Sequence, residues 1–423
     1  MIFVVSLLRQ LFMAPGYSQG IDQRLMSRLD ELGGKNGALY FKLPSPSNLV
    51  AIPQDPKNPL TNAKVDLGRL LFHDTALGSK PLIEGLSYRS YTCATCHNAG
   101  AAFQVATRQS IGDGGIGFGK RGEDRVKNPN YREREIDVQM RKSPTVLNSA
   151  FSETVFWDGQ FGAKGSNIGT ENEWKNSVPA AVNHLGFDGL ESQAIAAFEV
   201  HRLGLGEDFF SEYPEYIELF AAAFPDLEEE ERHSDFAAAL AIAAYERTLL
   251  TDQAPFQKWL DGERKAMSRN EKKGAMLFFG KGGCVSCHSN PALGNVDFHA
   301  LGMGELKGIG TYRTNGFKNE RLGRGGFTRR PEDMYKFKTP QLYNLADAAF
   351  FGHGATFTSI DEVIHYINTA EPQSKEIYLD QLSPMFKPLN LTSSEVGLIT
   401  LFLKKSLYDA SITGYSPPSV SSK

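Results

Sequence analysis

The chain has 423 residues, of which 41% are hydrophobic and 22% are charged, and its formal net charge is −4. These values are typical of a globular protein with room for two or three domains, and they exclude a largely disordered chain. The small negative charge argues against nucleic acid as a partner. No stretch of about 18 uninterrupted apolar residues occurs, so we predict no membrane span.

Residues 1–20 read MIFVVSLLRQLFMAPGYSQG and contain the first apolar run of the chain. This run is too short to cross a bilayer as a helix. It is similar to the apolar core of a secretion signal but lacks the basic segment that normally precedes that core. We therefore expect residues 1–20 to be a secretion signal with a truncated start.

Helices are predicted at corresponding places in the two halves of the chain. Gly68–Phe72 (GRLLF) and Gly274–Phe278 (GAMLF) share the pattern Gly-x-x-Leu-Phe, in which a small residue lets two helices cross closely. A later segment in each half, 235–250 and 391–407, has helical composition, and the second opens with a capping box at Thr392. Strand-like alternation is scarce, so we predict a mainly α fold with long loops.

All four cysteines lie in two copies of one pentapeptide, Cys93-x-x-Cys96-His97 and Cys284-x-x-Cys287-His288. Disulfides within such close pairs would cross-link little of the chain. Zinc modules usually separate their cysteine pairs by about 15–20 residues, whereas these copies lie 191 positions apart. Cys-x-x-Cys-His is the attachment pattern of haem c, in which the thiols bind the porphyrin and the histidine binds iron.

We therefore predict two covalently bound haem c groups, with His97 and His288 as iron ligands. Each would belong to a cytochrome c-like haem domain, 55–262 and 263–410, and a helix cap at Ser268–Glu271 (SRNE) opens the second. Haem attachment of this type takes place outside the bacterial cytoplasm. A periplasmic protein is therefore expected.

The chain from Leu67 to Leu407 resembles the bacterial di-haem cytochrome c peroxidase family, including its MauG-like branch. The resemblance rests on segments in family order, among them CATCHNAGAAFQ, SIGDG, KSPTVLNSAF, FWDGQ, LESQA, AYERTLLTDQAPFQKWLDG, CVSCHSNPALG and FKTPQLYNLADAAFFGHG. It implies an oxidoreductase whose N-terminal haem reacts with hydrogen peroxide. The C-terminal haem would take electrons from a small redox protein, such as a cytochrome c or a cupredoxin.

The resemblance also implies catalytic roles for three residues. Trp157 matches a tryptophan between the two haems and implies an electron relay, although a tryptophan is also a common core anchor. Gln193 matches a glutamine that assists O–O cleavage. Asp113 stands where some members carry a distal histidine. Because aspartate is a poor ligand of haem iron, we predict an open sixth position, as in the MauG-like branch, unless another side chain fills it.

Two further positions depart from the family pattern around the haems. A family glutamate ten residues after Gln193 falls at Leu203, or at Arg202 if the loop slips, and Glu199 and His201 are the nearby candidates to replace it. The sixth ligand of the second haem aligns with Ile367, which cannot bind iron. We predict Tyr366 in its place, with His365 and Met303 as alternatives.

Two more departures concern the region between the domains. Lys142, in KSPT, replaces an asparagine of the family's calcium site, and since an ammonium repels a dication, its presence argues against calcium there. His353 follows Gly352, which occupies the position of a family histidine, so a role in electron entry stays open. Two insertions, 114–140 and 162–189, are expected to form a lid or a docking surface at the first haem, or to be tolerated loops.

The leading prediction is a periplasmic di-haem c oxidoreductase that reduces hydrogen peroxide at the His97 haem with electrons relayed through the His288 haem. One alternative is a MauG-like enzyme that uses peroxide to oxidise a partner protein, which the replacement at Asp113 and the insertions favour. The other is a di-haem electron carrier without peroxide chemistry, which the missing glutamate favours.

Overall fold

The computed structural model describes residues 20–175, 179–314 and 318–413. The predicted secretion signal at 1–20 lies outside the described residues, apart from its last position. Helices and loops make up almost all of the described chain, which confirms the mainly α prediction. Within this part of the chain, no helix is both long and apolar enough to cross a membrane.

The α-helices of the first half connect through long loops. They are α1 (Ile21–Leu32), α2 (Asn62–His73), α3 (Glu84–Ser87), α4 (Cys93–Cys96), α5 (Glu171–Trp174), α6 (Gly189–Val200), α7 (Phe209–Glu212), α8 (Glu215–Ala223), α9 (Glu229–Arg232) and α10 (Asp235–Arg247). Those of the second half are α11 (Pro255–Leu260), α12 (Arg269–Phe278), α13 (Lys318–Arg321), α14 (Arg324–Thr328), α15 (Ile360–Thr369), α16 (Ser393–Leu401) and α17 (Ala410–Thr413).

Short helical turns and strands complete the described elements. The 3₁₀ turns are η1 (Gly34–Phe41), η2 (Leu49–Ala51), η3 (Thr75–Leu77), η4 (Ala99–Ala101), η5 (Ser149–Phe151), η6 (Gly165–Asn167), η7 (Pro179–Leu185), η8 (Cys284–Ser286), η9 (Pro331–Asp333), η10 (Leu345–Asp347) and η11 (Leu379–Gln381), and η12 (Phe402–Ser406) is a π turn. Two antiparallel pairs join β1 (Gly115–Ile116) with β2 (Val126–Lys127), and β3 (Phe298–His299) with β4 (Phe337–Lys338).

In the first half, α2 crosses α10 at the glycine that the sequence singled out. A Cβ atom built on Gly68 would lie 1.8 Å from the carbonyl oxygen of Ala241, so only glycine allows the two backbones to approach this closely. Around the crossing, a buried core runs from Leu67 to Leu249 and includes the apolar face of α6. This crossing confirms the predicted helix contact in the first half.

The second half repeats the arrangement with α12 and α16. A Cβ atom on Gly274 would lie 2.0 Å from the carbonyl oxygen of Leu398. Both helices begin with the predicted capping boxes, since Ser268 and Thr392 each accept from the backbone N–H three residues on. The two predicted helix starts are therefore confirmed.

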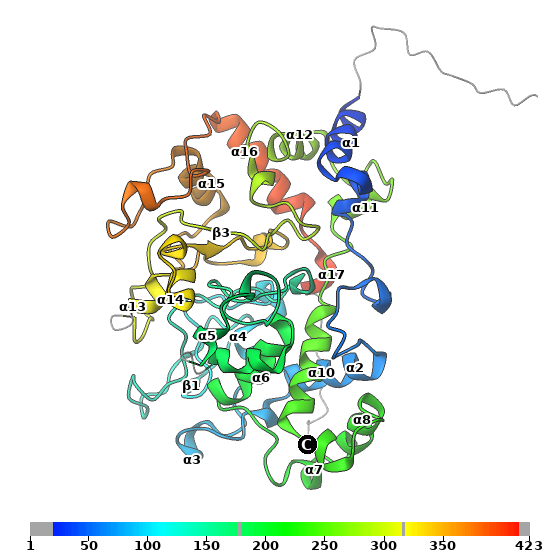
Figure 1. The fold of residues 1–423 in the computed structure, drawn as a ribbon, viewed down its shortest axis with the longest axis vertical. Helices are drawn as coiled ribbons and strands as arrows, with labels where there is room; N and C mark the ends of the chain where they lie inside the picture. The colour runs from blue at the N-terminus through cyan, green and yellow to red at the C-terminus, as the bar shows by residue number, and fades with distance from the viewer. Residues whose placement is uncertain (1–19, 176–178, 315–317, 414–423) are drawn as a thin grey trace, which may run out of the picture.

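The two halves occupy opposite ends of the molecule along its longest axis, with α12, α15 and α16 at one end and α2, α7, α8 and α10 at the other (Figure 1). The sequence analysis missed the role of the N-terminal segment. Helix α1 and turn η1 contribute to the core of the second half, not the first, where Leu25, Leu29 and Phe41 are buried with Trp259 and Phe279.

Candidate active site

The first Cys-x-x-Cys-His motif is held against the α2–α10 crossing. Helix α4 opens with a capping box at Thr92, whose hydroxyl also donates to the carbonyl oxygen of Phe72 on α2 at 3.0 Å. His97 follows α4, and its Nδ1 lies 3.1 Å from the carbonyl oxygen of Phe103. A carbonyl can only accept, so Nδ1 carries the proton and Nε2 is left with its lone pair.

The second motif has the same local design on the other half. Cys284–Ser286 forms the turn η8 after Gly283, whose φ of 66° suits glycine, and His288 Nδ1 lies 2.8 Å from the carbonyl oxygen of Leu293. Burial lowers the pKa of both His97 and His288 to about 4, so both imidazoles are neutral at pH 7. A neutral imidazole with a free Nε2 is the form that binds a metal ion.

The cysteine thiols fit porphyrin attachment better than a thiolate metal site. Burial raises the pKa of Cys96 and of Cys284 to about 12, which disfavours the thiolates that zinc would need. Among residues 20–175, 179–314 and 318–413, no group of three or more His, Cys, Asp or Glu side chains is placed to hold a metal ion. The motifs therefore stand as two separate sites.

Each motif opens onto its own cavity, and the two cavities share a wall. The first, of about 330 Å³, contains Cys93, Cys96 and His97, and the second, of about 600 Å³, contains Cys284, Cys287 and His288. The residues that line both cavities are His97, Lys142, Pro144, Phe156, Trp157, Gln193 and Glu246. The structure thus brings two of the predicted catalytic residues, Trp157 and Gln193, to the boundary between the cavities.

Trp157 is fixed in this wall by hydrogen bonds at both its ring and its backbone. Its Nε1 donates to the carbonyl oxygen of Lys142 at 2.8 Å, and its own carbonyl accepts from the N–H of Lys338 at 2.7 Å. The ring meets His353 edge-on at 6.2 Å between centroids, and His353 stacks on Phe337 at 3.6 Å. His353 is 2% exposed, so it lies inside the molecule between aromatic neighbours and not on the surface.

Two lysines on the cavity walls, the buried Lys142 and the half-buried Lys338, test whether haem groups fit. Lys142 Nζ contacts Oε1 of Gln104, and Lys338 Nζ donates to the hydroxyl of Ser152 at 2.9 Å. Burial lowers their pKa to about 7 and about 8, and neither ammonium forms an ion pair with a described carboxylate. A buried cation without a counter-charge is costly. The carboxylate groups of a haem would supply that charge, so these residues fit the group.

Glu246 is a site residue that the sequence analysis missed. It lies at the end of α10, is 4% exposed, and its Oε2 has no hydrogen-bond partner among the described residues. Burial, together with the charge of Glu191, raises the pKa of Glu246 to about 8. The available signal was a glutamate that directly follows the largely apolar run AAALAIAAY of a predicted helix.

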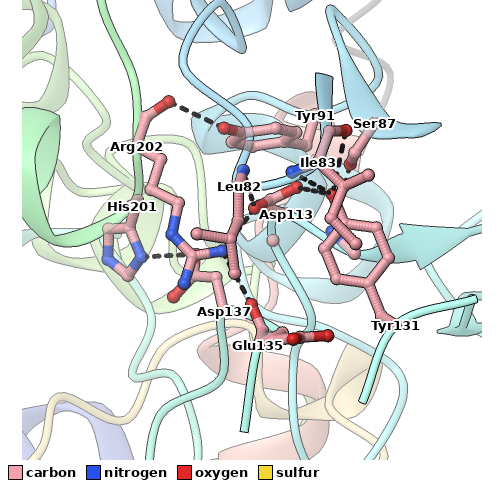
Figure 2. Close-up of polar contacts among 12 residues, drawn as sticks. Leu82, Ile83, Ser87, Tyr91, Asp113, Tyr131, Glu135, Asp137, His201 and Arg202 are labelled. Carbon is pink, nitrogen blue, oxygen red and sulfur yellow. Dashed lines mark hydrogen bonds and ion pairs between the residues drawn. The ribbon is translucent and has the colours of Figure 1, made fainter. Parts of the chain in front are cut away.

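Asp113, the third residue predicted to be catalytic, does not line either cavity. Its carboxylate accepts from the N–H of Leu82 and the hydroxyl of Tyr131, both at 2.9 Å, and pairs with the guanidinium of Arg202 (Figure 2). The side chain is fully buried. These three partners hold Asp113 in an internal network beside the cavity that His97 faces, and its catalytic role stays a prediction.

His201, the residue before Arg202, lies in the wall of the first cavity. His201 ends α6, lines the first cavity, and its Nδ1 lies 2.9 Å from Oδ2 of Asp137, which also lines that cavity. Figure 2 shows the two pairs, His201 with Asp137 and Arg202 with Asp113. Glu199, the other candidate to replace the family glutamate, is exposed and does not line the cavity.

Tyr366 is also placed differently from the expectation. Its hydroxyl donates to the carbonyl oxygen of Leu301 at 2.5 Å, and burial raises its pKa to about 12. It does not line the second cavity, and neither does His365, whereas Met303 and Met385 do. The sixth ligand of the second haem thus stays a prediction, and of the candidates Tyr366, His365 and Met303 it is Met303 that lines the second cavity.

Both insertions contribute to the walls of the first cavity. Residues Asp137, Val138, Gln139 and Met140 come from the first insertion, and Glu173 and Pro179 come from the second. This placement is beside the His97 motif, where the sequence analysis expected a lid, a docking surface or tolerated loops.

The chain is similar to several known peroxidases. Residues 62–265 match the family model described as Di-haem cytochrome c peroxidase. The cytochrome-c peroxidase IdrP1 of Denitromonas iodatirespirans is 28% identical over 399 residues, covering 86% of each chain. The methylamine utilization protein MauG of Methylorubrum extorquens is 27% identical over 364 residues, covering 84% of this chain and 81% of its own.

Solved structures share the fold. The crystal structure of a MauG-like protein associated with microbial copper homeostasis superposes with a TM-score of 0.56 at 23% identity, covering 88% of this chain and 96% of its own. A Y463M variant of the diheme peroxidase BthA from Burkholderia thailandensis gives 0.53 at 16% identity, covering 90% and 92%. With its two cysteine–histidine cavities, the chain is similar to the di-haem cytochrome c peroxidase family over residues 62–265, and the named relatives are oxidoreductases.

Proposed function

We propose that the chain is a periplasmic enzyme that reduces hydrogen peroxide at a haem c bound in the first cavity. Cys93 and Cys96 would hold that haem covalently and His97 would ligate its iron, while Cys284, Cys287 and His288 would do the same in the second cavity. The halves 55–262 and 263–410 would then be two cytochrome c-like haem domains. Electrons would enter at the second haem from a small redox protein.

The observation that carries this proposal is the shared wall between the cavities. Two haem groups in these cavities would be separated by a wall that includes Trp157, Lys142, Gln193 and Glu246. Trp157 is held rigidly by two hydrogen bonds, and a fixed aromatic ring is suited to pass electrons across the wall. Reducing one peroxide to two waters needs two electrons and two protons, and adjoining haem sites would deliver both electrons within one chain.

The chain's own residues have separate tasks in this proposal. When bound, the haem iron supplies the site at which peroxide coordinates and is reduced. His97 presents a neutral Nε2 to it, because Nδ1 is held by the carbonyl of Phe103. Lys142 and Lys338 would bind haem carboxylates, which also explains why Lys142 occupies a position where relatives are expected to hold calcium. Gln193 provides an amide that can orient peroxide by hydrogen bonds.

A second candidate function is the peroxide-dependent oxidation of a partner protein. It is favoured by the similarity to MauG and by the two insertions, whose residues line the first cavity and extend its surroundings. The same haem sites and the same Trp157 wall would serve, with electrons drawn from the partner instead of from a reduced donor.

Steady-state peroxide consumption by the purified holoprotein tests the proposal. With a reduced cytochrome c or cupredoxin as donor, we expect two donors to be oxidised for each peroxide consumed. Consumption of peroxide without donor oxidation, together with a mass increase on a co-expressed neighbouring protein, would favour the second candidate. No consumption with any donor would leave an electron carrier and overturn the proposal.

A further inference from the structure

The first cavity contains a histidine–aspartate pair that is built into its wall. His201 and Asp137 both line the cavity, and the Nδ1 of His201 lies 2.9 Å from Oδ2 of Asp137. Carboxylate oxygens accept, so the proton of His201 lies on Nδ1, which leaves Nε2 of the neutral ring with its lone pair. The Nε2 lone pair is therefore available to a molecule in the cavity that His97 also faces.

Asp137 is held in position by the backbone around it. The N–H of Asp137 donates to the carbonyl of Asp113 and its carbonyl accepts from the N–H of Gly112, both at 2.9 Å. A Cβ atom on Gly112 would lie 2.2 Å from Oδ2 of Asp137, so this glycine leaves the space that the carboxylate fills. The carboxylate is 7% exposed, and its neighbour His201 shields it from solvent.

The end of α6 directs two neighbouring side chains to two different carboxylates. His201 is the C-cap residue of α6. Arg202 follows with a φ of 55°, a left-handed conformation that turns the chain sharply. As a result, Arg202 pairs with the internal Asp113 while His201 pairs with Asp137 in the cavity wall (Figure 2). Asp137 raises the pKa of His201 by its charge and its hydrogen bond, and the charge of Arg202 opposes this with a smaller effect.

We propose that His201, oriented by Asp137, is the group that transfers the proton during cleavage of the peroxide O–O bond. This inference rests on the proposed function. Nε2 takes the proton from the peroxide oxygen that coordinates the metal and gives it to the outer oxygen. The O–O bond breaks, its electron pair leaves with the outer oxygen, and that oxygen departs as water. The remaining oxygen becomes the second water with two electrons from the donor and two protons from solvent.

The charges that face His201 set the pH at which it can act. Burial lowers its pKa, but the charge and hydrogen bond of Asp137 outweigh burial and the opposing charge of Arg202, so the pKa is raised above 6.5. His97 faces the same cavity as a neutral ring. Only the unprotonated Nε2 can take the first proton. The rate of the peroxide reaction should therefore fall as the pH decreases through the pKa of His201, above 6.5. We call this part of the pH–rate profile the limb. Asp137→Asn should move the limb to lower pH.

The experiment compares wild type with His201→Gln and Asp137→Asn by stopped-flow absorbance, measuring the second-order rate of the holoprotein with hydrogen peroxide from pH 5 to 9. A matched control is His184→Gln, which replaces an exposed histidine of the same half that lines neither cavity. A general acid–base group contributes about 10²–10⁴ in rate, so we expect His201→Gln to lose at least about 100-fold and to lose the limb.

A second readout is independent of turnover. Fluoride bound to the ferric haem accepts a hydrogen bond from a protonated His201, so its affinity in wild type should rise below the limb, and His201→Gln should abolish that rise. Equal peroxide rates in wild type and His201→Gln, or an unchanged fluoride profile, would overturn the inference alone. A loss of the limb in Glu246→Gln instead would assign the proton to that carboxyl. An unreactive wild type would overturn the proposed function itself.

Discussion

Gly274 offers a quantitative test of the helix crossing that supports the second site. A Cβ at this position would lie 2.0 Å from the carbonyl oxygen of Leu398, whereas ordinary contact begins at 3.4 Å, so α12 and α16 would have to separate by about 1.4 Å. Overpacking of this kind costs about 1–3 kcal/mol, and backbone atoms cannot rotate away, which favours the upper end. Alanine recovers about 1 kcal/mol of helix propensity. We therefore expect Gly274→Ala to lower the free energy of unfolding by about 2 kcal/mol.

Gly397→Ala is the matched control on the partner helix. Gly397 is exposed in α16 and a Cβ there would meet nothing within 4 Å, so alanine should stabilise the protein by up to about 1 kcal/mol. Denaturant unfolding of both variants, followed by circular dichroism and by haem absorbance, should show a difference of about 3 kcal/mol between them. If Gly274→Ala were as stable as Gly397→Ala, the close backbone crossing would be refuted.

Three other predictions concern the wall between the cavities. Lys142→Met removes a buried positive charge and should lower the reduction potential of an adjoining haem in a spectroelectrochemical titration. Lys273→Met, at an exposed lysine, is the control and should leave that potential unchanged. Equal potentials in wild type and Lys142→Met would place the ammonium away from the haems. Trp157→Phe should slow donor-dependent turnover about tenfold or more and leave the rate of the first reaction with peroxide unchanged. Trp174→Phe is the control, because Trp174 lines neither cavity. Unchanged turnover in Trp157→Phe would exclude the relay. Glu246, with a pKa raised to about 8, binds a proton in the folded state that the unfolded state releases above about 4.5, so stability should fall as the pH rises between these values. Glu246→Gln should flatten that dependence in unfolding measured from pH 5 to 8, and an unchanged slope would contradict the buried, protonated carboxyl.

Local sequence patterns carried the prediction of the helix pairs and of the two pentapeptides. The helix crossings at Gly68 and Gly274 could be predicted because a close crossing requires a small residue. The helix starts at Ser268 and Thr392 could be predicted because a capping box is formed by residues three positions apart. Trp157 and Gln193 were expected at the first site from the family resemblance, and both line the cavity of His97.

Other side chains take positions that the sequence alone does not predict, because these positions depend on contacts across the chain. Asp113 is turned inward by Arg202, which lies 89 positions away, and the hydroxyl of Tyr366 is bound by the carbonyl of Leu301, 65 positions away. Glu246 and Lys338 become site residues only because the two halves bring their walls together. The partner of His201 comes from a loop that the sequence marked only as an insertion.

The most direct test of the central claim is a low-temperature EPR spectrum of the ferric holoprotein before and after stoichiometric hydrogen peroxide. EPR reports the axial ligation of both irons at once. We expect a high-spin signal from the haem at His97 that peroxide abolishes, because Asp113, a poor iron ligand that replaces the distal histidine of some relatives, does not line that cavity. Two low-spin signals that peroxide leaves unchanged would contradict an open, peroxide-reactive first site.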